Sequence, residues 1–301
     1  MATPRDMLLD PELLGRLKSL ELIARSLVEG FLVGLHRSPY HGFSVEFAEY
    51  RQYIPGESTQ NIDWRVFAKT DRHYVKVFQE ETNLMARLLL DVSASMDTPP
   101  TEGLPSKLLY AKLLAAALSY LLLKQNDAVG LVTFDTKALE MIPPRSSRKQ
   151  LMHLMARLQN ASVGRRTHVG QVLSEMADRM WRRGLVIVIS DLIDDPQTVL
   201  RGLKHFRHRQ HEVLVFHVLD PRELDLDFGR QARFVDPEGD FDPISAQPWH
   251  LKESYASEVS AWRKHLGREC GMHQIDYVPL TTETPFDVAL MAYLAKRARL
   301  G

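Results

Sequence analysis

Cysteine is almost absent from this sequence, which contains a single one, Cys270, among 301 residues. One cysteine cannot form a disulfide within the chain, so the composition favours a reducing compartment. Net charge is absent too, because 38 basic side chains balance 38 acidic ones. The molecule therefore has no overall field that would favour nucleic acid or an anionic membrane, and any electrostatic choice of partner must be local.

Long apolar runs are also missing. The longest, from Leu113 to Leu123, falls short of the roughly 20 residues that a membrane-spanning helix needs. Near the N-terminus, apolar residues recur at helical spacing between charges and never form the uninterrupted core of a signal peptide. We therefore expect a cytoplasmic protein. Internal repeats, low-complexity tracts and flexible linkers are lacking as well, which favours a chain that folds as one unit.

The first 84 residues differ in pattern from the rest of the chain. Residues 10–34 fit an amphipathic helix, whose apolar stripe needs a surface to cover. From 38 to 82 the periodicity fades into aromatics, charges and turn residues, with short strands predicted near 45–51 and 74–80. We expect residues 1–84 to form an N-terminal helix plus an extended arm packed on the body.

From Met85 to Gly301 the sequence alternates between apolar runs and helical patterns. Buried strands are predicted at 86–93, 128–135, 184–192, 212–220 and 273–280. Helices are predicted at 106–125, 147–159, 167–184, 196–209, 247–267 and 285–300, with a loop or hairpin around 233–242. This alternation indicates an α/β fold with a doubly wound, mostly parallel sheet. Residues 138–142 follow the preceding strand too closely for a crossover, so we expect that strand to be antiparallel.

Polar side chains gather where these strands end. Ligands of open parallel sheets bind beyond the carboxyl ends of the strands, where the strand order reverses. Three segments would bring hard oxygen ligands there: Asp91, Ser93, Ser95, Thr167 and Asp191. A set without histidine or cysteine selects Mg²⁺, Mn²⁺ or Ca²⁺. With only two carboxylates, the cation would keep much of its charge and attract an acidic side chain of a protein partner.

Other polar residues near these segments have simpler explanations. Asp97, Asp194 and Asp195 are typical of solvated loops and helix caps. Three histidines, His205, His208 and His211, are spaced by three residues, but they end a basic helix where cationic side chains offset the dipole, so we do not expect zinc. Arg165 and Arg166 precede Thr167 and would flank the cation. They are candidate partner contacts or simply solvated side chains.

The pattern DVSAS, then a distant threonine, then an aspartate after an apolar strand resembles the Rossmann-like von Willebrand factor A fold. That resemblance implies that Asp91 and Asp191 act largely through bridging waters, while Ser93, Ser95 and Thr167 bind the ion directly. The preceding segment, SVEFAEYRQYIPGESTQNIDWRVFAKTDRHYVKVFQEE, resembles the family called domain of unknown function 58. Its members are typically encoded beside MoxR-type AAA+ ATPases, which implies such an ATPase and a client protein as partners.

The sequence departs from that family at one place in this segment. Many relatives carry arginine where Gln60 and Asn61 stand, which puts in doubt a charge pair in the arm but not the cation site. Several relatives also carry membrane helices ahead of this segment.

These residues favour a cytoplasmic, cation-dependent adaptor without enzymatic activity, and no catalytic residue is predicted. The alternative is a magnesium-dependent hydrolase with Asp91 as nucleophile or general base. Against it, Ser93 stands where aspartyl phosphatases carry a second carboxylate. A Walker A loop, a G-x-S-x-G elbow and an H-E-x-x-H helix are all missing from the sequence. Binding of nucleic acid is disfavoured because the basic runs are short.

Overall fold

The computed structural model describes residues 19–37, 50–52, 74–76, 84–164, 168–229, 232–235 and 242–300. Its centre is a six-stranded sheet, in the spatial order β10-β7-β6-β3-β4-β5. In chain order the strands are β3 (Met85–Asp91), β4 (Ala128–Phe134), β5 (Ala138–Arg145), β6 (Leu185–Ser190), β7 (Glu212–Leu219) and β10 (Ile275–Thr281). All neighbours pair in parallel except β4 and β5. The predicted α/β fold, including the antiparallel strand, is confirmed.

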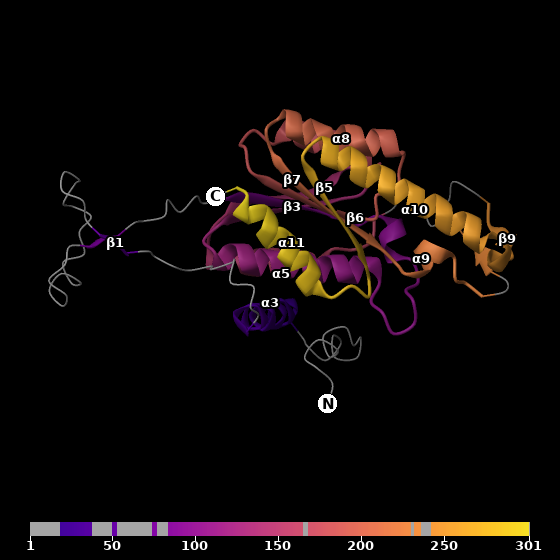
Figure 1. Cartoon of the computed structure of the whole chain (residues 1–301), viewed down its shortest axis with the longest axis horizontal. Helices are drawn as coiled ribbons and strands as arrows, with labels where there is room; N and C mark the ends of the chain where they lie inside the picture. The colour runs from indigo at the N-terminus through magenta and orange to yellow at the C-terminus, as the bar shows by residue number, and fades with distance from the viewer. Residues whose placement is uncertain are drawn as a thin grey trace.

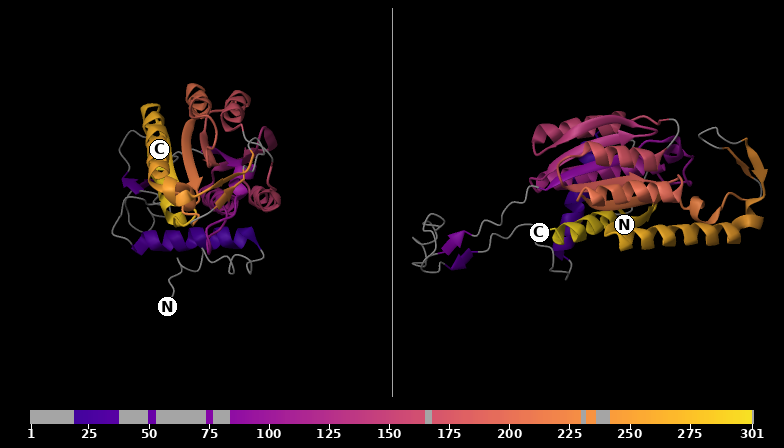
Figure 2. Two further views of the ribbon diagram at one scale, coloured as in Figure 1. Left: turned by 90° about the vertical axis from the view of Figure 1, so that its right-hand side faces the viewer. Right: turned by 90° about the horizontal axis from the view of Figure 1, so that it is seen from above.

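Helices cover both faces of the sheet (Figures 1 and 2). One face carries α5 (Lys107–Lys124), α6 (Arg148–Asn160) and α11 (Phe286–Ala298), and the other carries α7 (Val169–Arg179), α8 (Pro196–His208) and α10 (Pro248–Met272). A hydrophobic core lies between the sheet and the helices on each face, and alternate residues of a strand point into one core or the other. In β3, Leu88 and Leu90 face the first core and Leu89 the second. This period of two, with both faces of the central strands covered by helices, explains why β3, β6 and β7 are mostly apolar.

The predicted N-terminal helix is α3 (Leu20–Arg37), which lies against α5 and α6. Its buried side chains are Ile23, Ala24, Leu27 and Val28, and they join the first core. Because α3, α6, α11 and the sheet surround α5, that helix is apolar on all sides rather than amphipathic. The first part of the predicted helix, residues 10–18, lies outside the described residues.

Two short antiparallel ladders complete the secondary structure. Strands β1 (Tyr50–Gln52) and β2 (Tyr74–Lys76) pair with each other and stand apart from the six-stranded sheet in Figure 1. The packing predicted for the arm depends on residues between and around them that lie outside the described residues, so it stays a prediction. Strands β8 (Ala232–Phe234) and β9 (Ile244–Ala246) form the expected hairpin ahead of α10.

Two predicted helix ends are wrong. The sequence predicts a helix over 167–184, but α7 ends at Arg179, and Trp181 is 91% exposed in the connection to β6. The last apolar residue that faces the core is Met180, and the chain must turn after it to begin the next strand. The sequence also predicts that α10 ends at 267, but the helix continues to Met272, where Leu266 and Cys270 are buried against the sheet. No described helix is long and apolar enough to cross a lipid bilayer.

Candidate functional site

The strand order reverses between β3 and β6, which are neighbours although β4 and β5 lie between them in the sequence. From β3 the chain goes to β4 on one side, and from β6 it goes to β7 and then β10 on the other. The carboxyl ends of these two strands therefore border the topological switch point of the sheet. Asp91 is the last residue of β3, and Asp191 follows the last residue of β6. The fold thus brings the two predicted carboxylates to one place.

Asp91 is completely buried, and both of its carboxylate oxygens accept hydrogen bonds. The backbone N–H of Ser93 donates to Oδ1 over 2.9 Å, and the hydroxyl of Ser190 donates to Oδ2 over 2.6 Å. Burial, together with the charge of Asp191, raises the pKa of Asp91 to about 7. Its carboxylate has no cationic partner among the described residues, so its negative charge is held at a cost that a bound cation would remove.

The two serines of the motif lie on the loop that follows Asp91. Ser93 precedes a single 3-10 turn, Ala94–Asp97, yet its side chain makes no capping bond to that turn. Instead its hydroxyl lies 3.0 Å from the hydroxyl of Ser95, and both residues are buried. Two hydroxyls that converge in this way, beside a buried carboxylate, present lone pairs to a common point.

Asp191 is also fully buried, and its surroundings contain a residue that the sequence analysis did not single out. Lys107, the first residue of α5, donates from Nζ to Asp191 Oδ2 over 2.8 Å. The same ammonium group contacts Glu223 Oε1 at 2.6 Å, in the short helix α9 (Arg222–Asp225). Burial opposes the charge of Lys107, but the two carboxylates outweigh it and raise the pKa of the lysine.

A buried histidine, His217, is hydrogen-bonded to the backbone of Asp191. His217, on β7, lies with Nε2 2.8 Å from the backbone oxygen of Asp191 and Nδ1 2.5 Å from the hydroxyl of Tyr277. A carbonyl oxygen can only accept, so Nε2 carries the proton and Nδ1 accepts from the tyrosine. Burial lowers the pKa of His217 to about 4, which keeps the ring neutral. The ring therefore fixes the backbone of the loop without adding charge.

Thr167, Arg165 and Arg166 lie outside the described residues, but the chain on both sides of them is tied to the site. Gly164 donates from its backbone to Val92 on the Asp91 loop over 2.6 Å. Gly170 donates to the carboxylate of Asp194, three residues after Asp191, over 3.1 Å. The two attachments connect the segment containing Thr167 to both predicted ligand loops.

Two of the acids predicted to be structural, Asp194 and Asp195, accept hydrogen bonds from the first turns of α7 and α8. Asp195 caps α8 by accepting from the backbone and hydroxyl of Thr198, as expected from its position before a helix. Asp194 tethers α7 through the contact with Gly170.

The histidines near the end of α8 have partners of their own. His211 is buried and bonded to the backbone of Met180, and His205 contacts Asp178. Within the described residues, no three His, Cys, Asp or Glu side chains converge as metal ligands. The predicted cation site contains only two side chains of those types, Asp91 and Asp191, and its remaining ligands are hydroxyls.

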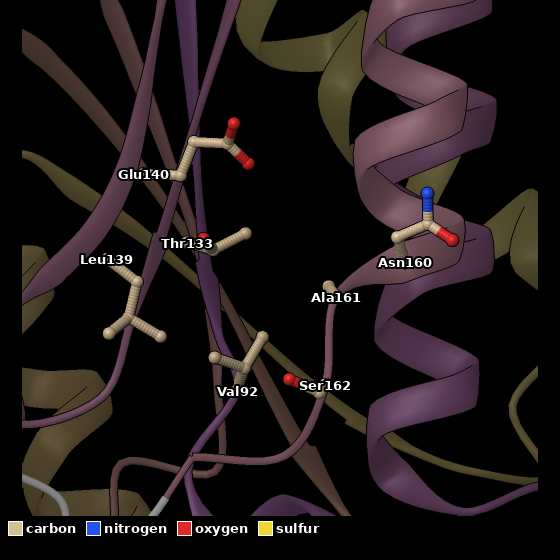
Figure 3. A pocket seen from close by; sticks show the side chains of 7 residues that line it. All are labelled: Val92, Thr133, Leu139, Glu140, Asn160, Ala161 and Ser162. Atoms are coloured by element: carbon tan, nitrogen blue, oxygen red, sulfur yellow. The ribbon is translucent and has the colours of Figure 1, made fainter.

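A hollow of about 290 Å³ opens beside the Asp91 loop (Figure 3). It is lined by Val92, Thr133, Leu139, Glu140, Asn160, Ala161 and Ser162. Val92 lies between Asp91 and Ser93, so one wall of the hollow is the loop of the candidate site itself. The only ionisable side chain in its lining, Glu140, pairs with Arg157 at 3.2 Å. The hollow is therefore a concave surface with a few polar side chains next to the switch point.

Two mycobacterial proteins resemble this chain over nearly its whole length. "Uncharacterized protein Mb1516" of Mycobacterium bovis and "Uncharacterized protein Rv1480" of Mycobacterium tuberculosis are each 28% identical over 294 residues, which cover 96% of this chain and 91% of theirs. Among solved structures, BatB from Bacteroides thetaiotaomicron is 19% identical over 72% of this chain and 98% of its own, with a TM-score of 0.47. The SpRpn10 VWA domain is 11% identical over 69% and 94%, with a TM-score of 0.36.

Those structural likenesses are too distant to support an argument about the site. A family does match most of the chain. The family described as "Protein of unknown function DUF58" covers residues 49–264, which include the second half of the N-terminal segment, Asp91, Asp191, Lys107 and Glu223. This chain therefore belongs to the DUF58 family.

Proposed function

We propose that this chain is a cytoplasmic protein-interaction module whose binding depends on one divalent cation, Mg²⁺ or alternatively Mn²⁺ or Ca²⁺. The proposed ligand set is that of the von Willebrand factor A-like motif: Asp91, Ser93, Ser95, Thr167 and Asp191. The observation that carries the proposal is the meeting of two fully buried carboxylates at the switch point. One of them, Asp91, lacks a cationic partner among the described residues, although burying an unpaired charge is costly.

The donor chemistry fits such an ion. The hydroxyls of Ser93 and Ser95 lie 3.0 Å apart and are buried beside Asp91. Hydroxyl and carboxylate oxygens are hard ligands of the kind that Mg²⁺ and Ca²⁺ prefer. When bound, the cation would offer a Lewis-acidic position to an anionic oxygen from outside the chain. An acidic side chain of a partner protein meets that requirement.

The hydrogen bonds of Asp91 favour binding over catalysis. Each of its oxygens accepts from a neighbour, Ser93 or Ser190, at 2.9 Å or less. A carboxylate held at both oxygens is fixed in orientation, which suits a ligand that positions an ion. It suits a nucleophile less well, because attack on a substrate would require one of these bonds to break. We therefore propose an adaptor rather than a hydrolase.

The identity of the partners rests on the family resemblance. Members of the DUF58 family are typically encoded beside MoxR-type AAA+ ATPases. We therefore propose two partners for this chain: such an ATPase, and a client protein that presents an acidic residue. Chaperoning or maturation of protein complexes would be the shared task. Arg165 and Arg166 stand next to Thr167 in the sequence, and their positive charges would attract an acidic segment of the client.

Calorimetric titration of metal-stripped protein with Mg²⁺, and then with Mn²⁺, tests the proposal. We expect one binding site in the wild type and none in Asp91→Ala or in the double variant Ser93→Ala, Ser95→Ala. Thermal unfolding provides a second measurement, because a ligand at about 100 times its Kd stabilises the folded state by about 2.7 kcal/mol. A wild-type protein that binds neither ion, or an Asp91→Ala variant that binds as well as wild type, would overturn the proposal.

A further inference from the structure

Lys107 is a buried lysine whose charged group lies at the switch point, beside Asp191. The side chain is 1% exposed, whereas lysine is almost never fully buried unless it is paired. It begins α5, a helix whose other buried residues are nearly all apolar. Its Nζ lies 2.8 Å from Asp191 and 2.6 Å from Glu223. The ammonium group is therefore held at one point by two carboxylates, one from the loop after β6 and one from helix α9.

The position of this ammonium group is fixed by more than one element. Ser106 caps the first turn of α5 by accepting from the backbone N–H of Leu109, which anchors the residue before the lysine. Glu223 is itself held, because its Oε2 accepts from the backbone N–H of Asp220 over 2.9 Å. Its side chain is 20% exposed, compared with 1% for Lys107, so Glu223 is the member of this pair that reaches solvent. A positive charge is thus built into the fold beside the proposed cation ligands.

That charge changes the electrostatics of the proposed ligand set. When both are ionised, as a bound cation would require, Asp91 and Asp191 bring two negative charges to the switch point, and Lys107 cancels one of them. Charges a few ångströms apart at a buried site interact by several kcal/mol even at an effective dielectric constant of about 20. A divalent cation near Asp191 would be repelled by the ammonium group and would meet a carboxylate that is already neutralised. Glu223 offsets part of that repulsion through its contact with the same nitrogen.

We propose that Lys107 acts as an internal counter-charge that weakens the hold of this chain on a divalent cation, so that the cation retains positive charge for an external carboxylate. Glu223 tunes the effect by partly neutralising the lysine. This inference rests on the proposed function and specifies the chemical group of the partner that the cation binds. The ligand that completes the site is an anionic carboxylate, and its binding restores the charge balance that Lys107 removes.

The alternative is that Lys107, Asp191 and Glu223 form an ion-pair network with only a structural role. Under that alternative, loss of any member loosens the loop and weakens cation binding or leaves it unchanged. Under the counter-charge proposal, two substitutions have opposite effects. Removing the lysine charge strengthens cation binding, and removing the Glu223 charge weakens it. The sign of the change therefore separates the two roles.

The experiment is calorimetric titration with Mg²⁺ alone of the wild type, Lys107→Met and Glu223→Gln. We expect Mg²⁺ to bind Lys107→Met at least about ten-fold more tightly, because a unit charge at a buried site contributes more than the roughly 1.4 kcal/mol that a ten-fold change represents. We expect Glu223→Gln to bind several-fold more weakly.

A matched control removes a lysine charge elsewhere on the molecule. Lys204 pairs with Glu269 at 3.0 Å between α8 and α10, with both side chains partly exposed. Lys204→Met alters the net charge by the same amount as Lys107→Met, yet its Mg²⁺ affinity should equal that of the wild type. If both lysine variants gain affinity equally, net charge and not the position of Lys107 is responsible, and the proposal fails.

A second titration uses acetate as the carboxylate probe, at constant ionic strength with chloride as the reference anion. Acetate should raise the apparent Mg²⁺ affinity of the wild type by a larger factor than that of Lys107→Met. Equal factors in the two proteins would overturn the link between Lys107 and the external carboxylate.

The remaining outcomes are distinguishable. Wild type that binds Mg²⁺, with Lys107→Met equal or weaker and Glu223→Gln unchanged, overturns the counter-charge role and leaves the cation site standing. Wild type that binds neither Mg²⁺ nor Mn²⁺ overturns the proposed cation site, and the counter-charge role fails with it even if Lys107→Met binds Mg²⁺. Absence of binding in both folded proteins overturns the cation site itself. Should Lys107→Met fail to fold, Glu223→Gln still decides, because unchanged affinity there contradicts the proposal.

Discussion

His211 shows how one buried ring can make the stability of this protein depend on pH. The residue before β7 is fully buried, and its Nε2 bonds to the backbone oxygen of Met180 at 3.1 Å. Because that oxygen only accepts, Nε2 carries the proton, and the other ring nitrogen, Nδ1, is buried without a partner among the described residues. Protonation of Nδ1 would place an uncompensated charge in the core. Burial accordingly lowers the pKa of His211 below its usual value of 6.5.

The sign of the pH dependence follows from that shift. Below pH 6.5 the unfolded chain takes up a proton at His211 while the folded protein does not, so the contribution of this residue to stability falls as the pH decreases. The slope is at most about 1.4 kcal/mol per pH unit for one proton. We expect His211→Phe to be less stable than wild type at about pH 7.5, through the lost hydrogen bond, but to lose less stability as the pH falls from about 7 to about 5.5.

Urea unfolding at several pH values measures this difference. Comparing variant with wild type cancels the titration of every other group. His208→Gln, a substitution at an exposed position on the preceding helix, should give a curve parallel to wild type. Parallel curves for His211→Phe and wild type would show that the buried nitrogen has no effect on pH dependence.

At the same scale, the site illustrates what residue patterns can and cannot predict. Asp91, Ser93, Ser95 and Asp191 are predictable because hydroxyls and carboxylates directly after apolar strands are an unusual pattern, and the structure brings them to one switch point. Lys107 is not, because a lysine at the start of a helix is ordinarily solvated. Lys107 is buried only because the tertiary structure brings Asp191 and helix α9, with Glu223, against it, and no local sequence pattern predicts that contact.

The pair of helices α7 and α8 depends on two glycines at their contact. A Cβ added to Gly202 would lie 2.7 Å from the backbone oxygen of Gly170 and 2.8 Å from Cβ of Leu173. A Cβ on Gly170 would lie 2.4 Å from the backbone of Thr198. Since the nearest atoms are backbone, a methyl group fits only if the helices move apart. These glycines therefore set the distance between two helices that both border the switch point.

We expect Gly202→Ala to lower the free energy of unfolding by about 1–3 kcal/mol through overpacking. Gly30→Ala in α3 is the matched control, because a Cβ added to Gly30 would meet no atom within 4 Å. In that helix interior, alanine should stabilise by up to about 1 kcal/mol. Chemical denaturation of both variants checks the prediction, and a stabilised Gly202→Ala would show that α7 and α8 separate without cost.

The elements themselves are largely predictable, for reasons visible in particular segments. Strand β6 is an apolar run that ends in Ser190, and β7 is apolar except for Glu212 and His217. Helices α6 and α8 begin after the capping residues Ser147 and Asp195. The end of α7 is not predictable in the same way, because Trp181 and the arginines after it continue a plausible helical pattern. Tertiary structure decides there, since the chain must turn to enter β6 beside β3.

On the scale of the whole molecule, the N-terminal helix is the clearest link between the first part of the chain and the sheet. Figure 2 shows α3 lying across the helical layer on one side of the sheet, and its contacts are with α5 and α6. Arg25 and Glu29 pair on its outer side at 2.8 Å, and Glu29 also accepts from the hydroxyl of Tyr120 in α5. The apolar contacts, not this exposed pair, should dominate the attachment.

Two substitutions on opposite sides of α3 test whether the helix is part of the cooperative unit. Ala24 is completely buried against the body, whereas Leu22 is 53% exposed. Ala24→Glu places an unpaired carboxylate and extra volume in the contact, so it should lower the free energy of unfolding of the whole chain by about 2–4 kcal/mol. Leu22→Glu introduces the same charge on the outer face and should change stability by less than about 0.5 kcal/mol.

Circular dichroism in urea, recorded together with the fluorescence of Trp262 and the other tryptophans, measures both variants. Trp262 packs edge-on against His217 on the opposite side of the sheet from α3, at a ring distance of 4.9 Å. If α3 and the sheet unfold together, Ala24→Glu shifts the fluorescence and circular-dichroism transitions to lower urea by the same amount. If α3 is an independent appendage, the fluorescence transition stays where it is in wild type, because the core around Trp262 does not sense the loss of the helix.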